Sequence, residues 1–130
     1  MGYRSDRDVV ITDIIGPGPI AIHRKYSFTP DATWQENEIA RIYGESGRVH
    51  TYLGDWHSHP YGSRELSIKD LGVMIRVATH RPARAIRPIM GILYNNPKWE
   101  LVIWRFAFSK IVSGMPAVEM KVVWFNGKGG

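Results

Sequence analysis

Two histidines stand in a short extended segment, Leu53-Gly54-Asp55-Trp56-His57-Ser58-His59-Pro60, and a serine and an aspartate follow at positions 67 and 70. Side chains two residues apart on a β-strand point to the same face and lie roughly 6.6 Å apart. His57 and His59 are therefore predicted to share one face of a strand, where both rings can approach one ion. Pro60 restricts His59 to extended geometry and cannot continue a ladder, so the strand is expected to end there.

A helix is predicted to begin at Ser67, whose hydroxyl can cap it, with Asp70 three residues further on. This places the Asp70 carboxylate in the first turn, where it can complete a site with His57 and His59. Two imidazoles and one carboxylate that leave a fourth position to water are typical of a catalytic zinc centre and not of a closed structural one. The predicted metal ligands are thus His57, His59 and Asp70.

Each of these residues also has an ordinary structural interpretation. A single histidine on a strand is more often a partly buried residue with a hydrogen-bond partner than a ligand, and a serine followed by an aspartate three residues later is a common capping pair. The joint pattern favours the metal site: His-x-His-Pro, six residues, and then Ser-x-x-Asp.

That pattern resembles the JAMM signature of the JAB/MPN metallopeptidase family, in which His-x-His is followed after ten residues by Asp, with a Ser three residues before the Asp. His57, His59, Ser67 and Asp70 match it without an insertion. The resemblance is to the bacterial branch of the family and covers at least residues 2–70. Further matching segments are Ile11-Thr12-Asp13, Gly16-Pro17-Gly18-Pro19, Phe28 to Asp31, Trp34-Gln35 and Tyr52-Leu53-Gly54.

The resemblance implies zinc-dependent hydrolysis of an amide bond, typically an isopeptide bond or the bond after a ubiquitin-like carboxyl tail. It implies that His57, His59 and Asp70 hold one Zn²⁺ ion, with water as the fourth ligand. The Ser67 hydroxyl would donate a hydrogen bond to the oxyanion, worth about 3 kcal/mol, or would serve only as the helix cap. The expected partner is a ubiquitin-like or sulfur-carrier protein, and no residue selects between the two.

The match breaks at the general base. Family members carry a Glu on the first strand, whereas Met1-Gly2-Tyr3-Arg4 looks like the end of that strand, so the expected Glu would lie before Met1. Loss of a general base removes roughly 10²–10⁴ in rate, so we expect zinc binding with poor hydrolysis. Asp55 is expected to orient an imidazole, and Glu65 is a candidate replacement base. The alternative is a non-catalytic MPN-like scaffold that binds a protein partner.

The rest of the chain predicts an α+β fold, with a mixed, largely antiparallel sheet flanked by two helices, similar to the JAB/MPN fold. Glycine, proline and asparagine at 16–19 and 95–97 are expected to turn the chain between antiparallel neighbours. The six expected strands are residues 9–15, 20–26, 49–57, 86–94, 98–108 and 117–125.

The first helix is expected to follow a cap in Thr29-Pro30-Asp31, with Pro30 at the first helical position, and to end at Gly44 or Gly47. The second helix is expected to end at His80-Arg81-Pro82. Residues 1–125 are expected to form one domain, and residues 126–130 a flexible tail.

Composition excludes several other classes. The 130 residues include no cysteine, which excludes disulfides, thiolate zinc sites and a cysteine nucleophile. The apolar run at 99–108 contains Glu100 and Arg105 and is too short to span a membrane, so a cytoplasmic location is expected. The formal charge of +5 is compatible with nucleic acid, but the basic residues are scattered, which disfavours it. A bare sheet edge at the amino end would favour self-association.

Overall fold

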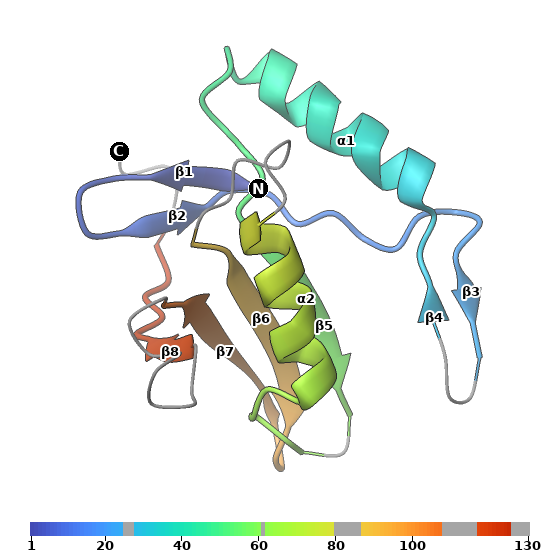
Figure 1. The fold of residues 1–130 in the computed structure, drawn as a ribbon, viewed down its shortest axis with the longest axis vertical. Coiled ribbons are helices and arrows are strands. Elements are labelled where there is room, and N and C mark those ends of the chain that lie inside the picture. Colours follow the sequence, from blue (N-terminus) through green and yellow to red (C-terminus); the bar gives the residue numbers. More distant parts are fainter. Residues whose placement is uncertain (25–27, 61, 80–86, 108–116, 126–130) are drawn as a thin grey trace. The chain divides into compact units, whose positions relative to one another are not determined.

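The computed structural model describes residues 1–24, 28–60, 62–79, 87–107 and 117–125 (Figure 1). The chain divides into two units, residues 1–53 and residues 54–130, each with its own internal contacts. The expected tail at 126–130 and the expected helix end at 80–82 lie outside the described residues, as do parts of the expected strands at 20–26, 86–94 and 98–108.

The first unit contains two short hairpins and one helix. Strand β1 (Gly2–Arg4) pairs antiparallel with β2 (Val9–Ile11), and β3 (Ile22–His23) pairs antiparallel with β4 (Phe28–Thr29). Helix α1 (Ala32–Glu45) follows β4.

The expected turn at 16–19 between antiparallel neighbours is wrong, because β2 and β3 pair with other strands. The segment instead attaches to the start of α1. The Asp31 amide donates to the Pro17 carbonyl at 2.9 Å, and the Gln35 side chain donates to the Gly16 carbonyl at 3.0 Å. Pro17 and Pro19 have no amide hydrogen to give to a ladder, which explains why the strand does not continue through them.

Helix α1 also begins later than expected. Its cap is Asp31, whose carboxylate accepts a hydrogen bond from the Trp34 amide at 3.2 Å, so Pro30 precedes the cap and is not the first helical residue. The helix runs through Gly44 and ends at the cap residue Ser46. Gly47, one of the two expected stops, follows with a φ of 67°, a left-handed conformation that glycine adopts without strain.

The second unit is built on a sheet of four strands in the described part of the chain, in the order β5-β6-β7-β8. Strand β5 (Gly54–His59) runs parallel to β6 (Ile89–Asn95), which is antiparallel to β7 (Trp99–Phe106), and β7 is antiparallel to β8 (Ala117–Met120). The expected turn at 95–97 does join β6 and β7. The α+β class and the mixed, largely antiparallel sheet are therefore confirmed.

Several strands are shorter than expected. The strand expected at 9–15 ends at Ile11, and the strand expected at 20–26 is reduced to Ile22–His23. The strand expected at 49–57 begins only at Gly54, because Thr51 exchanges both of its backbone hydrogen bonds with Gly2. The strand expected at 117–125 ends at Met120, and the large apolar side chains beyond it are exposed.

Helix α2 (Ile68–Thr79) lies over one face of this sheet and contacts β6 and β7 (Figure 1). Every second side chain of both strands, at positions 90–94 and 102–106, joins one core cluster with Met74 of the helix. The core consists of Met74, Met90, Ile92, Tyr94, Val102, Trp104, Phe106 and Ala117. In the β5–β6 register, His57 is opposite Ile92 and His59 is opposite Tyr94. Because paired residues share a face of the sheet, both histidines lie on the face that α2 covers.

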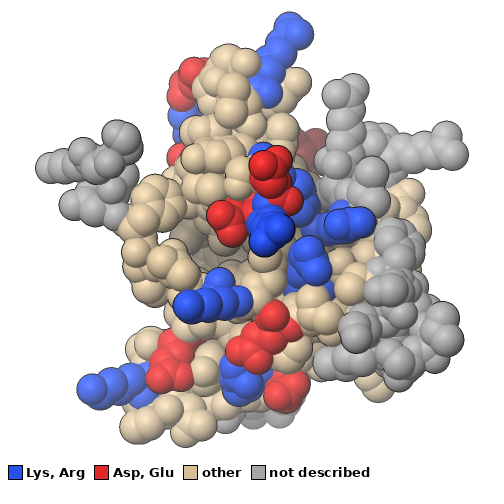
Figure 2. Space-filling model, turned by 90° about the vertical axis from the view of Figure 1, so that its left-hand side faces the viewer, with Lys and Arg blue, Asp and Glu red and all other residues tan. Residues whose placement is uncertain are grey.

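No helix in the described ranges is both long and apolar enough to cross a membrane. Acidic and basic side chains are mixed on the face drawn in Figure 2, where red groups lie among blue ones.

The first residue of β5, Gly54, is expected to tolerate no side chain. A Cβ added there would lie 1.8 Å from the carbonyl oxygen of Ile89 on β6. Gly54→Ala should therefore lower the free energy of unfolding by about 1–3 kcal/mol or more, as measured by chemical denaturation. The matched control is Gly72→Ala on exposed α2 surface, where a Cβ meets nothing within 4 Å and helix propensity predicts a gain of about 0.5–1 kcal/mol. Equal effects of the two substitutions would contradict this account.

Candidate metal centre

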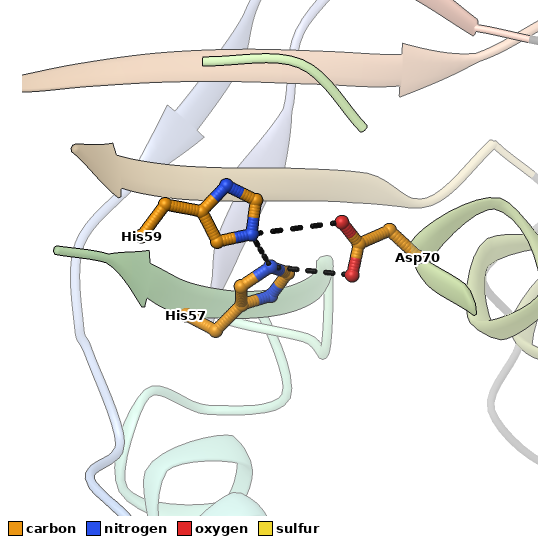
Figure 3. Close-up of side chains that lie close together, drawn as sticks. All are labelled: His57, His59 and Asp70. Carbon is orange, nitrogen blue, oxygen red and sulfur yellow. Dashed lines mark hydrogen bonds and ion pairs between the residues drawn. The ribbon is translucent and has the colours of Figure 1, made fainter. Parts of the chain in front are cut away.

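The three predicted ligands come together between β5 and the first turn of α2 (Figure 3). The Nε2 atoms of His57 and His59 are 2.8 Å apart. His57 Nε2 lies 3.2 Å from Asp70 Oδ1, and His59 Nε2 lies 3.7 Å from Asp70 Oδ2. Both rings turn the same nitrogen toward the carboxylate, so three potential ligand atoms surround one point.

These separations fit a tetrahedral metal ion. Zinc bonds to nitrogen and oxygen of about 2.0–2.1 Å place two ligand atoms of a tetrahedron roughly 3.3 Å apart. The observed separations of 2.8, 3.2 and 3.7 Å bracket that value. Among the described residues, no other group of three or more His, Asp or Glu side chains brings its ligand atoms so close together.

His59 is oriented by a main-chain carbonyl. Its Nδ1 lies 2.8 Å from the oxygen of Ser63. A carbonyl oxygen can only accept a hydrogen bond, so Nδ1 must carry the proton and donate it. In the neutral ring, Nε2 then keeps its lone pair, which faces His57 and Asp70. Such an outer partner is what fixes the tautomer of metal-binding histidines in general.

Asp70 is oriented by the start of its own helix. The Ser67 amide donates to Asp70 Oδ2 at 2.8 Å, and the Asp70 amide donates to Ser67 Oγ at 3.0 Å. The predicted capping pair is therefore confirmed as a reciprocal box. Asp70 is only 8% exposed, and the bond that caps α2 also holds its carboxylate beside the histidines. Ser67 Oγ accepts in this box and retains its own proton to donate.

Burial sets the charge state of His57. Desolvation lowers the pKa of its imidazole, the Asp70 carboxylate raises it, and the neighbouring His59 lowers it, with a lowered pKa as the net result. The Asp55 carboxylate, two residues earlier on β5, contributes a smaller raising effect. The lowered pKa favours the neutral ring, which is the form that binds a metal ion.

A hollow of about 380 Å³ borders one of the three ligands, His59. Its lining residues are Ser58, His59, Pro60, Ser63, Glu65, Leu66 and Ser67. The candidate base Glu65 is therefore placed at the same hollow as His59 and Ser67. The residue that sequence reasoning missed is Ser63, and no local signal could have revealed it, because the group that contacts His59 is a backbone oxygen.

Comparison with known proteins finds metalloproteases and isopeptidases. No family model matches the chain. It is 46% identical over 100 residues to "Probable metalloprotease y4qB" of Sinorhizobium fredii, an alignment that covers 75% of this chain and 61% of the relative. It is 39% identical over 46 residues to "CD-NTase/cGAS isopeptidase" of Enterobacter hormaechei (35% of this chain and 26% of the relative).

A protein of the same name from Vibrio cholerae is 28% identical over 60 residues, covering 46% of this chain and 38% of the relative. The chain thus spans about six tenths of the length of the first of these relatives. The three names support the resemblance to JAMM-like metallopeptidases that the spacing of His57, His59, Ser67 and Asp70 indicates.

His57 of the metal-free protein is expected to titrate below the ordinary histidine pKa of about 6.5, because burial disfavours the imidazolium. Asp70→Asn removes a charge that stabilises the imidazolium and should lower the pKa of His57 further. Nitrogen-15 NMR titration measures both values, with the urea-unfolded chain as reference.

The folded state should bind fewer protons than the unfolded state between the two pKa values, so the free energy of unfolding should fall as pH falls through that window. A His57 pKa above that of the unfolded chain, or a rise in the Asp70→Asn variant, would contradict the arrangement.

Proposed function

We propose that this chain is a zinc-dependent isopeptidase or peptidase that hydrolyses an amide bond at the tail of a ubiquitin-like or sulfur-carrier protein. The observation that carries the proposal is the convergence of His57, His59 and Asp70 on one point with separations that suit a tetrahedral ion. The names of the relatives, a probable metalloprotease and two isopeptidases, support hydrolysis of a protein substrate.

The donor set favours zinc. Two imidazole nitrogens and one carboxylate oxygen, with room for a water ligand, are characteristic of catalytic zinc sites. Zinc bound by such a set supplies a nucleophile at neutral pH and polarises the carbonyl group under attack. The chain contributes three ligands held in advance: the Ser63 carbonyl orients His59, the Ser67 amide orients Asp70, and burial keeps His57 neutral.

The hollow beside His59 offers a place for the substrate. It is bordered by His59 on one strand and by Ser67 at the helix start, so a carbonyl bound there would lie near both. We propose that the Ser67 hydroxyl donates its proton to the developing oxyanion while its oxygen continues to cap α2. One serine would then serve both the helix and the reaction.

Hydrolysis also needs a general base that takes a proton from the attacking water. The three metal ligands cannot fill this role, because their lone pairs would bind the ion. Glu65 is the acidic residue that lines the hollow, and we propose it as the candidate general base. A positioned base contributes about 10²–10⁴ in rate, so Glu65→Gln should lower kcat by about that factor.

Zinc titration of the metal-free protein by calorimetry tests the metal site. His57→Ala removes a ligand and should weaken binding by more than the about 10–100-fold loss that removal of an outer hydrogen-bond partner causes. The matched control is His23→Ala, because His23 lies on β3 and packs on Phe28; it should bind zinc like the wild type. Wild-type binding no tighter than that of His57→Ala would end the metal assignment.

Cleavage of an isopeptide-linked or linear ubiquitin-like fusion by the zinc-loaded protein tests the reaction. Ser67→Ala should lower kcat by about 10²–10³ if its hydroxyl stabilises the oxyanion, and should cost about 1 kcal/mol of stability through the lost cap. Ser67→Thr keeps a hydroxyl for both tasks and should retain most activity.

If Ser67→Ala loses stability but keeps its kcat, Ser67 caps the helix and takes no part in the reaction. Partner binding without any cleavage would favour a non-catalytic scaffold.

A further inference from the structure

The loop between β5 and α2 holds His59 in place, and one arginine fastens that loop to the sheet. We propose that Arg64 is a positioning residue: by tying the loop to β7 and β8, it fixes the Ser63 carbonyl that sets the tautomer and direction of His59. This inference rests on the proposed metal function and names a residue, outside the matched motif, on which the ligand set depends.

Residue 64 is held at two points. Its backbone carbonyl accepts a hydrogen bond from Trp104 Nε1 at 3.0 Å. Its guanidinium forms an ion pair with Glu119 through Nη2 and Oε1. Trp104 on β7 and Glu119 on β8 are directly opposite each other in the sheet. One cross-strand pair therefore binds both the main chain and the side chain of Arg64: Trp104 contacts its carbonyl and Glu119 its guanidinium.

A third strand contributes to the same contact. Tyr94 on β6 contributes, after Glu119, to raising the pKa of Arg64, and the Tyr94 hydroxyl donates a hydrogen bond to Glu100 at 2.5 Å. Tyr94 is opposite His59 in the β5–β6 register and opposite Glu100 in the β6–β7 register. The groups that act on Arg64 therefore lie on three strands of the sheet, and one of them, Tyr94, is paired with the predicted ligand His59.

The planar peptide bond carries this anchoring to the metal ligand. The carbonyl of Ser63 lies in the same rigid plane as the nitrogen and Cα of Arg64. The contacts of Arg64 with Trp104 and Glu119 hold the Arg64 end of this plane in place. The Ser63 oxygen can then leave His59 Nδ1, 2.8 Å distant, only by rotation of the plane about its Cα–Cα axis. Holding residue 64 consequently restrains the acceptor that selects the tautomer of His59.

Global stability is a poor explanation for this ion pair. The side chains of Arg64 and Glu119 are 43% and 45% exposed, and exposed pairs contribute only about 0–1 kcal/mol to folding. The pair does connect positions 55 residues apart in sequence. Loss of the pair should therefore free the loop while the sheet remains folded. A positioning role predicts weaker metal binding at nearly unchanged stability, whereas a structural role predicts lower stability.

Arg64→Ala is the test variant, and Arg41→Ala is its matched control. Arg41 is also a half-exposed arginine with two carboxylate partners, Glu38 and Glu45, but all three lie on α1. Arg64→Ala should weaken zinc binding by about 10–100-fold, the range for lost outer partners of a metal site, with a Tm close to that of the control. Arg41→Ala should bind zinc like the wild type.

Two further measurements keep the test decisive. Nitrogen-15 NMR of the metal-free protein should show the His59 proton on Nδ1 in the wild type and a mixture of tautomers in Arg64→Ala. The exchanged pair Arg64→Glu with Glu119→Arg should restore most of the zinc affinity. If Arg64→Ala does not fold, Glu119→Ala removes the same pair from the sheet side and should weaken zinc binding in the same direction.

Zinc affinity and His59 tautomer unchanged in Arg64→Ala, in a protein whose wild type binds zinc, would overturn the inference. A wild type that binds no zinc would contradict the proposed function instead. In that case the tautomer of His59 in the metal-free protein still decides the role of Arg64.

Discussion

Because β5 runs parallel to β6, the chain between them has to cross from one end of the sheet back to the other, and α2 makes that crossing. The register of the parallel pair puts His57 and His59 on the face with the buried residues Ile92 and Tyr94, which is the face that α2 covers. The first turn of the helix is thereby brought to the histidines. The close approach of Gly54 to the β6 backbone is part of the same pairing.

The reciprocal hydrogen bonds of Ser67 and Asp70 hold a carboxylate at the end of the helix that reaches the histidines. An aspartate at the start of a helix is favoured by the unpaired amides there and by the helix dipole, whatever else it contacts. Here the same carboxylate also faces two imidazole nitrogens. Helix initiation and ligand placement therefore depend on one set of bonds, which lets four consecutive residues encode both.

Sequence reasoning succeeded where the determinants are local. The capping pair, the shared face of the two histidines and the turn at 95–97 each depend on a few adjacent residues. It failed where a segment pairs with residues that are distant in the sequence. Residues 16–17 hydrogen-bond to the start of α1 and do not form a hairpin turn, and Thr51 pairs with Gly2. The contact of Arg64 with Glu119 belongs to this second kind, because no local pattern relates a loop arginine to a strand far along the chain.

The three ligands also differ in what holds them. His59 and Asp70 each have a backbone partner outside the group, the Ser63 carbonyl and the Ser67 amide, so their positions do not depend on a cation. His57 is placed by its strand and contacts the other two ligands directly. The separations of His59 Nε2 from His57 and from Asp70, 2.8 and 3.7 Å, lie on either side of the roughly 3.3 Å that a tetrahedral ion requires. Each ligand atom is therefore within about half an ångström of a suitable position. Ligands that are held in advance in this way lose little side-chain entropy when an ion binds.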